Sequence, residues 1–235
     1  MQDAINDCKA GKLSANADSV HAWDEAVAFY TGSLEGTAQG GIGETGGAGS
    51  GLTGGYGPGE LQFTLAEKRC KNFGTCTADF DMNPHDGYSE VNKKIFALFS
   101  AGRDEILSAV DSTRSDKCEP ITETMNEISG LMLVPFIQGV QRYLYKTAQG
   151  TASAKEAGEL FAFASAALPF IDAVDSTAAD KLYNRAWKQD FTTESDFKTI
   201  KRAIEGTYSC IRLSCSMLHT IQNSPKTTVY NRCIC

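Results

Sequence analysis

Apolar residues recur every three or four positions over most of the chain, which is the period of an amphipathic helix. Segments with this spacing are residues 18–31, 60–72, 89–110, 120–147, 153–167, 170–188 and 194–221. Pro120 suits the first turn of its helix, whereas Pro135 is expected to kink it. Alternation typical of strands never extends beyond four residues, and no Asn-Gly or Asp-Gly turn joins two apolar runs. The pattern therefore predicts an all-α fold, a bundle of six to eight helices.

A glycine-rich segment interrupts this pattern. Residues 32–59 contain 13 of the 22 glycines of the chain. They include no Gly-Lys-Ser/Thr sequence and follow no predicted strand, so they do not match a phosphate-binding loop. We expect a long flexible loop between two helices, with a lid that orders over a ligand as the alternative. Because no internal repeat divides the chain, we expect a single helical domain over residues 1–235, ending in a cysteine-containing tail at residues 222–235.

Eight cysteines are the strongest compositional signal, and none of them forms a Cys-x-x-Cys pair. Zinc ribbons and thioredoxin-like motifs require that pair, so both are disfavoured. An even number of cysteines favours four disulfides that staple the helical bundle, with a connectivity that the sequence leaves open. Disulfides persist in oxidising compartments, so we expect a secreted, periplasmic or cell-surface protein. The cysteines are Cys8, Cys70, Cys76, Cys118, Cys210, Cys215, Cys233 and Cys235.

The charge balance excludes other classes of partner. The chain has 22 Lys and Arg against 29 Asp and Glu, a net charge of −7, and no basic stripe. We therefore expect no nucleic-acid partner. No stretch approaches the roughly 18–20 apolar residues of a membrane span, so we expect no membrane span either. Residues 1–4 lack the basic and apolar regions of a signal peptide, so we expect that, if the protein is secreted, this chain is a mature form with an added or retained Met1.

Histidine is rare, and His21 is the one with acidic neighbours. Asp24 and Glu25 follow it by three and four residues, so the three side chains project from one side of a helix. Tyr30 follows on the same helix. A histidine, two carboxylates and a phenol are ligands suited to iron, ferric iron above all. The alternative is a surface pair of His21 and Glu25 on a helix whose aromatic residues, Tyr30 included, belong to the core.

Acidic residues on other predicted helices are further candidate ligands. Glu123 and Glu127 are one turn apart, and Glu159 lies on the following helix. Helical bundles that hold iron build their sites from such inward-facing acids, although single acids on helices more often face solvent. No Glu-x-x-His sequence occurs, which argues against a ferritin-like di-iron oxidase. No nucleophile and base stand at a recognisable spacing, so we expect a protein that is not an enzyme.

Several stretches resemble one known family. The segment from His21 to Gly36 reads His-Ala-Trp-Asp-Glu-Ala-Val-Ala-Phe-Tyr-Thr-Gly-Ser-Leu-Glu-Gly, and residues 65–77, 91–96, 98–102 and 202–208 fit as well. They resemble the algal iron-assimilating periplasmic proteins, also described as high-CO2-inducible periplasmic proteins. The resemblance covers about residues 1–220, with the glycine-rich insertion at 36–59 as a departure.

The resemblance implies a secreted protein that is induced by iron shortage, binds iron outside the cell and assists its uptake. The positions that it carries over are His21, Asp24, Glu25 and Tyr30. Our leading hypothesis is thus an extracytoplasmic iron-binding protein, with water or carbonate completing the shell and Glu123, Glu127 or Glu159 as added ligands. A membrane-bound iron transporter or reductase is the expected receiver of the metal. The alternative is a non-catalytic, metal-free cell-surface or cell-wall interaction module.

Overall fold

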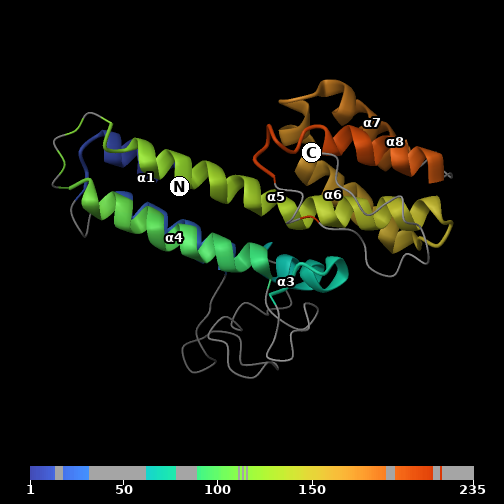
Figure 1. Ribbon diagram of the computed structural model, residues 1–235, viewed down its shortest axis with the longest axis horizontal. Coiled ribbons are helices and arrows are strands. Elements are labelled where there is room, and N and C mark those ends of the chain that lie inside the picture. Colours follow the sequence, from blue (N-terminus) through green and yellow to red (C-terminus); the bar gives the residue numbers. More distant parts are fainter. Residues whose placement is uncertain are drawn as a thin grey trace, which may run out of the picture. The chain divides into compact units, whose positions relative to one another are not determined.

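Within the residues that the structure describes, all regular secondary structure is helical (Figure 1). The computed structural model describes residues 1–13, 18–31, 62–77, 89–110, 112, 114, 116–188, 194–213 and 218. The helices are α1 (Gln2–Lys9), α2 (Asp18–Thr31), α3 (Gln62–Phe73), α4 (Glu90–Ser108), α5 (Glu119–Ala148), α6 (Ala154–Asp172), α7 (Ser176–Lys188) and α8 (Glu194–Glu205). The predicted all-α class is confirmed. The glycine-rich segment 32–59 and the tail 222–235 lie outside the described residues.

The helix boundaries around Pro169 differ from those of the sequence pattern. The prediction ended one helix at residue 167, but α6 continues through Pro169 to Asp172. Ala167 and Ile171 are fully buried, and the packing of this face offsets the hydrogen bond that proline removes. As a consequence, the next helix begins at Ser176 rather than at residue 170. Pro135 lies inside α5, and its predicted kink stays a prediction.

Two further differences concern the ends of the chain. The eight-residue helix α1 was not among the predicted segments, yet its Ala4, Ile5 and Cys8 are buried, and α1 packs on α2. At the other end, α8 stops at Glu205 instead of continuing to residue 221. Residues 206–212 form turns, and Arg212 adopts a positive φ of 59° that a helix cannot accommodate.

The chain divides into two compact units. The first comprises Met1–Lys68 and Asn92–Ser129, and the second comprises Arg69–Val91 and Gly130–Cys235. Each unit has its own buried apolar residues and its own disulfide, Cys8–Cys118 in the first and Cys70–Cys76 in the second. Cys210 has an exposed free thiol, and Cys215, Cys233 and Cys235 lie outside the described residues. The expected single domain therefore stays a prediction, while disulfide stapling is confirmed for two pairs.

The core of the first unit is organised around Trp23. Its side chain is fully buried, and its Nε1 donates a hydrogen bond of 2.8 Å to the carbonyl oxygen of Phe99. The indole lies directly against Gly102, where an added Cβ would fall 2.1 Å from Trp23 Cζ2. Only glycine leaves room for the indole at this point. The contact fixes α2 against α4 and so orients the opposite, exposed side of α2 toward solvent.

The second unit is held together by packing of α6 on α7 and of α7 on α8. Leu160, Ile171, Leu182 and Ile204 are fully buried. A capping box begins α6, in which Ser153 Oγ accepts from the Glu156 N–H at 3.3 Å and Glu156 Oε2 accepts from the Ser153 N–H at 2.9 Å. Across the described part of the chain, we find no helix with the length and apolar character needed to cross a membrane.

Candidate functional site

The exposed side of α2 carries three of the predicted iron ligands. His21, Asp24 and Glu25 are all exposed, and their spacing of three and four residues places them on adjacent turns of one helix. Neither His21 nor Glu25 makes a hydrogen bond or an ion pair with another described residue. Both side chains are therefore open to an external ligand.

Asp24 has a partner, but a weak one. Its Oδ1 lies 3.8 Å from Arg103 Nε on α4, and both side chains are about half exposed, at 52% and 50%. An exposed ion pair of this length contributes at most about 1 kcal/mol, because water and salt screen it. A metal ion could replace Arg103 as the partner of the Asp24 carboxylate at little cost in free energy.

Tyr30 does not join this group, since it is only 3% exposed and lies in the core of the first unit. Its hydroxyl donates to Asn92 Oδ1 at 2.5 Å, and Asn92 Nδ2 donates to Glu67 Oε1 at 2.5 Å and to the Phe63 carbonyl at 3.0 Å. Burial, with the nearby charge of Glu67, raises the pKa of the Tyr30 phenol well above its ordinary value. The phenol thus stays protonated, whereas iron is bound by phenolate.

The remaining predicted ligands lie on α5 and α6 rather than on α2. Glu123 and Glu127 are exposed on the part of α5 that belongs to the first unit. Glu123 lines a shallow hollow of about 450 Å³ beside the Arg114–Asp116 ion pair. Glu159 lies in the second unit, where Lys155 Nζ is 3.6 Å from its Oε1. Among the described residues, no three or more His, Cys, Asp and Glu side chains are already arranged to hold a metal ion.

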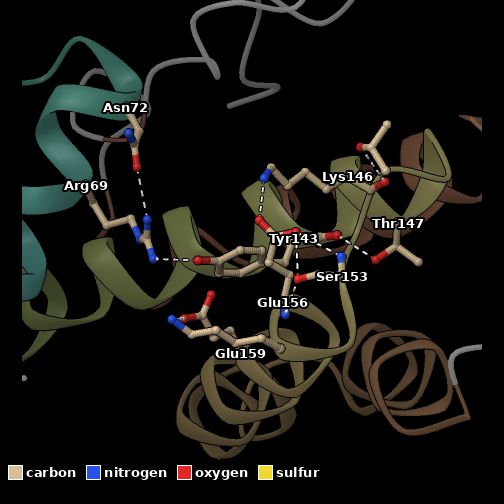
Figure 2. A network of polar contacts seen from close by, with 10 residues as sticks. Arg69, Asn72, Tyr143, Lys146, Thr147, Ser153, Glu156 and Glu159 are labelled. Atoms are coloured by element: carbon tan, nitrogen blue, oxygen red, sulfur yellow. Dashed lines mark hydrogen bonds and ion pairs between the residues drawn. The ribbon is translucent and has the colours of Figure 1, made fainter.

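Figure 2 shows a polar network in the second unit that the sequence did not reveal. Arg69 is only 2% exposed, and its guanidinium donates to Asn72 Oδ1 at 2.9 Å and to Tyr143 Oη at 3.2 Å. The guanidinium carbon Cζ of Arg69 lies 5.4 Å from the centre of the Tyr143 ring and 5.3 Å from the centre of the Phe163 ring. Both distances are within cation–π range. The buried Nε has no hydrogen-bond partner within the described part of the chain. Aromatic faces and neutral acceptors therefore surround this guanidinium.

Tyr143 connects this guanidinium to a carboxylate. Burial raises the pKa of the Tyr143 hydroxyl, and a hydrogen bond to Glu159 raises it further, while the charge of Arg69 acts in the opposite direction. The Tyr143 hydroxyl thus accepts a hydrogen bond from the Arg69 guanidinium (Figure 2) and is also influenced by the Glu159 carboxylate. Glu159 already has the Lys155 ammonium as a neighbour and influences the Tyr143 hydroxyl, so a metal ion at this carboxylate would compete with both.

A cluster of aromatic residues in the second unit also escaped sequence reasoning. Trp187 lies against both Phe161 and Tyr183, and all three side chains remain exposed. Aromatic residues on amphipathic helices usually pack inward, and helical periodicity alone does not distinguish a surface cluster from a core. Comparisons of the chain with protein-family models, with curated proteins and with solved structures gave no match. The local geometry must therefore carry any assignment of function.

Proposed function

We propose that this protein binds iron outside the cytosol and assists its uptake, with His21, Asp24 and Glu25 as the primary ligands. One observation supports this proposal above the others. The three side chains share the exposed side of α2, and His21 and Glu25 have no partner among the described residues. An imidazole and a carboxylate one turn apart form a bidentate metal site on a helix, and Asp24 adds a second carboxylate.

The donor set favours ferric iron. Two carboxylates and an imidazole are hard or borderline ligands, and the four cysteines in the two disulfides supply no thiolate. Three side chains leave open positions on the metal, which water or carbonate would fill. An open shell on an exposed helix suits reversible binding, because a cargo metal must be released to a membrane-bound transporter or reductase.

The disulfides support the proposed compartment. Cys8–Cys118 and Cys70–Cys76 persist only where thiols are not kept reduced. Of the other predicted ligands, Glu123 and Glu127 remain proposed as additional donors from the first unit. Tyr30 and Glu159 are left out of the proposed site, because Tyr30 is buried and bonded to Asn92, and Glu159 lies in the second unit beside Lys155.

Isothermal titration calorimetry tests the proposal. The wild-type protein is titrated with ferric nitrilotriacetate in air and with ferrous sulfate under argon, beside a His21→Ala/Glu25→Ala variant. A matched control is Asp172→Asn, which removes an exposed acid from α6 in the second unit. We expect ferric binding to wild type and control, and a loss of about tenfold or more in the double variant.

Equal ferric affinity in all three proteins would remove His21 and Glu25 from the site. No binding of either ion to the wild type would remove the iron function itself and favour the metal-free interaction module. We also propose that the protein is not an enzyme. Oxygen consumption above the buffer rate, when ferrous iron is added to the protein, would contradict that proposal and indicate an oxidase.

A further inference from the structure

An exposed aromatic cluster lies on α6 and α7 of the second unit. Phe161 is 36% exposed, Tyr183 is 42% and Trp187 is 49%. The ring centres of Phe161 and Trp187 are 3.9 Å apart, and those of Tyr183 and Trp187 are 5.0 Å apart with their planes inclined by 30°. Large apolar side chains that gather at the surface, instead of packing inside, mark a binding site.

Unused polar groups border the rings. Neither the Tyr183 hydroxyl nor the Trp187 indole N–H makes a hydrogen bond to another described residue. Asp180 and Asn184 precede Tyr183 and Trp187 by three residues each and therefore lie beside them on the same side of α7. Asn184 Nδ2 donates to the Asp180 carbonyl at 2.8 Å, which leaves the Asn184 Oδ1 and the Asp180 carboxylate as acceptors. Flat apolar faces thus adjoin both donors and acceptors.

From this arrangement we infer a binding site for an uncharged carbohydrate. One face of a pyranose ring presents C–H groups that pack on an aromatic ring, and its hydroxyl groups both donate and accept hydrogen bonds at the edge. Nucleotides and acidic polysaccharides also stack or hydrogen-bond, but their negative charge opposes Asp180 and the net charge of −7.

The exposed area of the cluster favours a sugar over a protein as the partner. Three aromatic side chains that each show half of their surface or less offer roughly 250–300 Å². A stable protein interface takes about 800 Å² from each partner. The cluster covers about a third of that area, which suits two or three sugar rings.

This site is independent of the proposed iron function. It lies in the second unit, whereas His21, Asp24 and Glu25 lie in the first. Either proposal can therefore fail without the other, and the two are tested with different ligands and different variants.

Tryptophan fluorescence provides the assay, because the two tryptophans of the chain differ in exposure. Trp23 is fully buried, so a ligand at the surface changes the emission of Trp187. The full chain is titrated with cellohexaose, laminarihexaose, mannohexaose and chitohexaose, and calorimetry repeats each titration that changes the emission. We expect a saturable blue shift and binding by calorimetry with at least one of the four hexasaccharides.

Variants assign the binding to the cluster. Trp187→Ala and Tyr183→Ala should each weaken binding about tenfold or more by calorimetry. The control Phe170→Ala removes another exposed aromatic residue of α6, 44% exposed, and should bind as the wild type does. Circular dichroism checks that each variant keeps its helical content.

Three results would overturn the inference. The first is no binding of any hexasaccharide at concentrations up to about 1 mM. The second is unchanged affinity in folded Trp187→Ala and Tyr183→Ala. The third is dimerisation of the wild type in sedimentation velocity that Trp187→Ala abolishes without any saccharide binding, since the cluster would then be an interface between copies of this chain.

Discussion

The phenol of Tyr30 donates a hydrogen bond to Asn92 Oδ1, although 62 positions separate the two residues in the sequence. The bond joins α2 to α4 inside the first unit. Asn92 also donates to Glu67, so Tyr30 holds one end of a buried network that reaches α3. In the structure, Tyr30 therefore belongs to the support of the fold rather than to the exposed side of α2.

Tyr30→Phe should lower the free energy of unfolding by about 1–2 kcal/mol, because it removes the phenol that donates to the buried Asn92 oxygen. Urea denaturation followed by circular dichroism measures this loss. The control Tyr183→Phe removes an exposed hydroxyl and should change stability by less than about 0.5 kcal/mol. Iron affinity should be the same in wild type and Tyr30→Phe. A variant of unchanged stability but weakened iron binding would return Tyr30 to the site.

The two disulfides should differ in their contribution to stability. Cys8–Cys118 closes a separation of 110 residues, and Cys70–Cys76 closes one of 6. Since a longer loop loses more entropy when it is closed in the unfolded chain, Cys8→Ser/Cys118→Ser should cost about 4–5 kcal/mol and Cys70→Ser/Cys76→Ser about 2 kcal/mol. Urea denaturation of both double variants measures the difference. An equal loss would contradict the loop-entropy explanation.

Two helical glycines should respond oppositely to alanine. At Gly102 the added Cβ meets the indole of Trp23, so Gly102→Ala should destabilise the protein by about 1–3 kcal/mol. At Gly158 no atom lies within 4 Å of the added Cβ, so Gly158→Ala should stabilise α6 by about 0.5–1 kcal/mol. Thermal unfolding compares the two. A stabilising Gly102→Ala would show that Trp23 can move away from its position.

Helical periodicity predicted α2 with its observed bounds, because the apolar stripe, the N-terminal polar residues and Gly32 all agree there. It missed α1, whose eight residues are too few for a clear period and which the Cys8–Cys118 disulfide and packing on α2 stabilise. It ended α6 at residue 167, whereas the burial of Ile171 keeps the turn that follows helical through Pro169.

The rotation of about 100° per residue in an α-helix explains which of the candidate site residues could be predicted from the sequence. Spacings of three and four residues place His21, Asp24 and Glu25 on one side of a helix, as observed. Tyr30 follows His21 by nine residues, a rotation of about 180° at 3.6 residues per turn, which places it on the opposite, buried side. The aromatic cluster and the Arg69 network join distant segments, and no local period in the sequence encodes such contacts.

Glu156 should make the stability of the second unit depend on pH in the acidic range. Its ion pair with Lys146 and its bonds to Ser153 lower the pKa of the carboxyl from 4.5 to about 2. Because the ionised form is favoured in the folded state, its contribution is complete above about pH 4.5 and is lost as the pH falls toward 2. Glu156→Gln keeps the capping geometry and removes the charge.

We therefore expect the difference in unfolding free energy between wild type and Glu156→Gln to be largest at neutral pH and to vanish near pH 2. Urea denaturation at a series of pH values measures it. Lys146→Gln should reproduce part of this dependence, since Lys146 is the main cause of the shift. A difference that stays constant from pH 7 to pH 2 would rule out the charge of Glu156 as the stabilising element.

Arg69 and Tyr143 should be energetically coupled. Arg69→Met leaves Asn72 Oδ1 and the Tyr143 hydroxyl without their buried donor and should cost about 1–3 kcal/mol. Arg69→Lys should restore little of this loss, because an ammonium cannot donate to both oxygens and stack on the ring as the planar guanidinium does. A double-mutant cycle with Tyr143→Phe, read by urea denaturation, should give a coupling energy of about 0.5–1.5 kcal/mol. Strict additivity of the two single variants would show that the Arg69–Tyr143 bond contributes nothing beyond the packing of the two side chains.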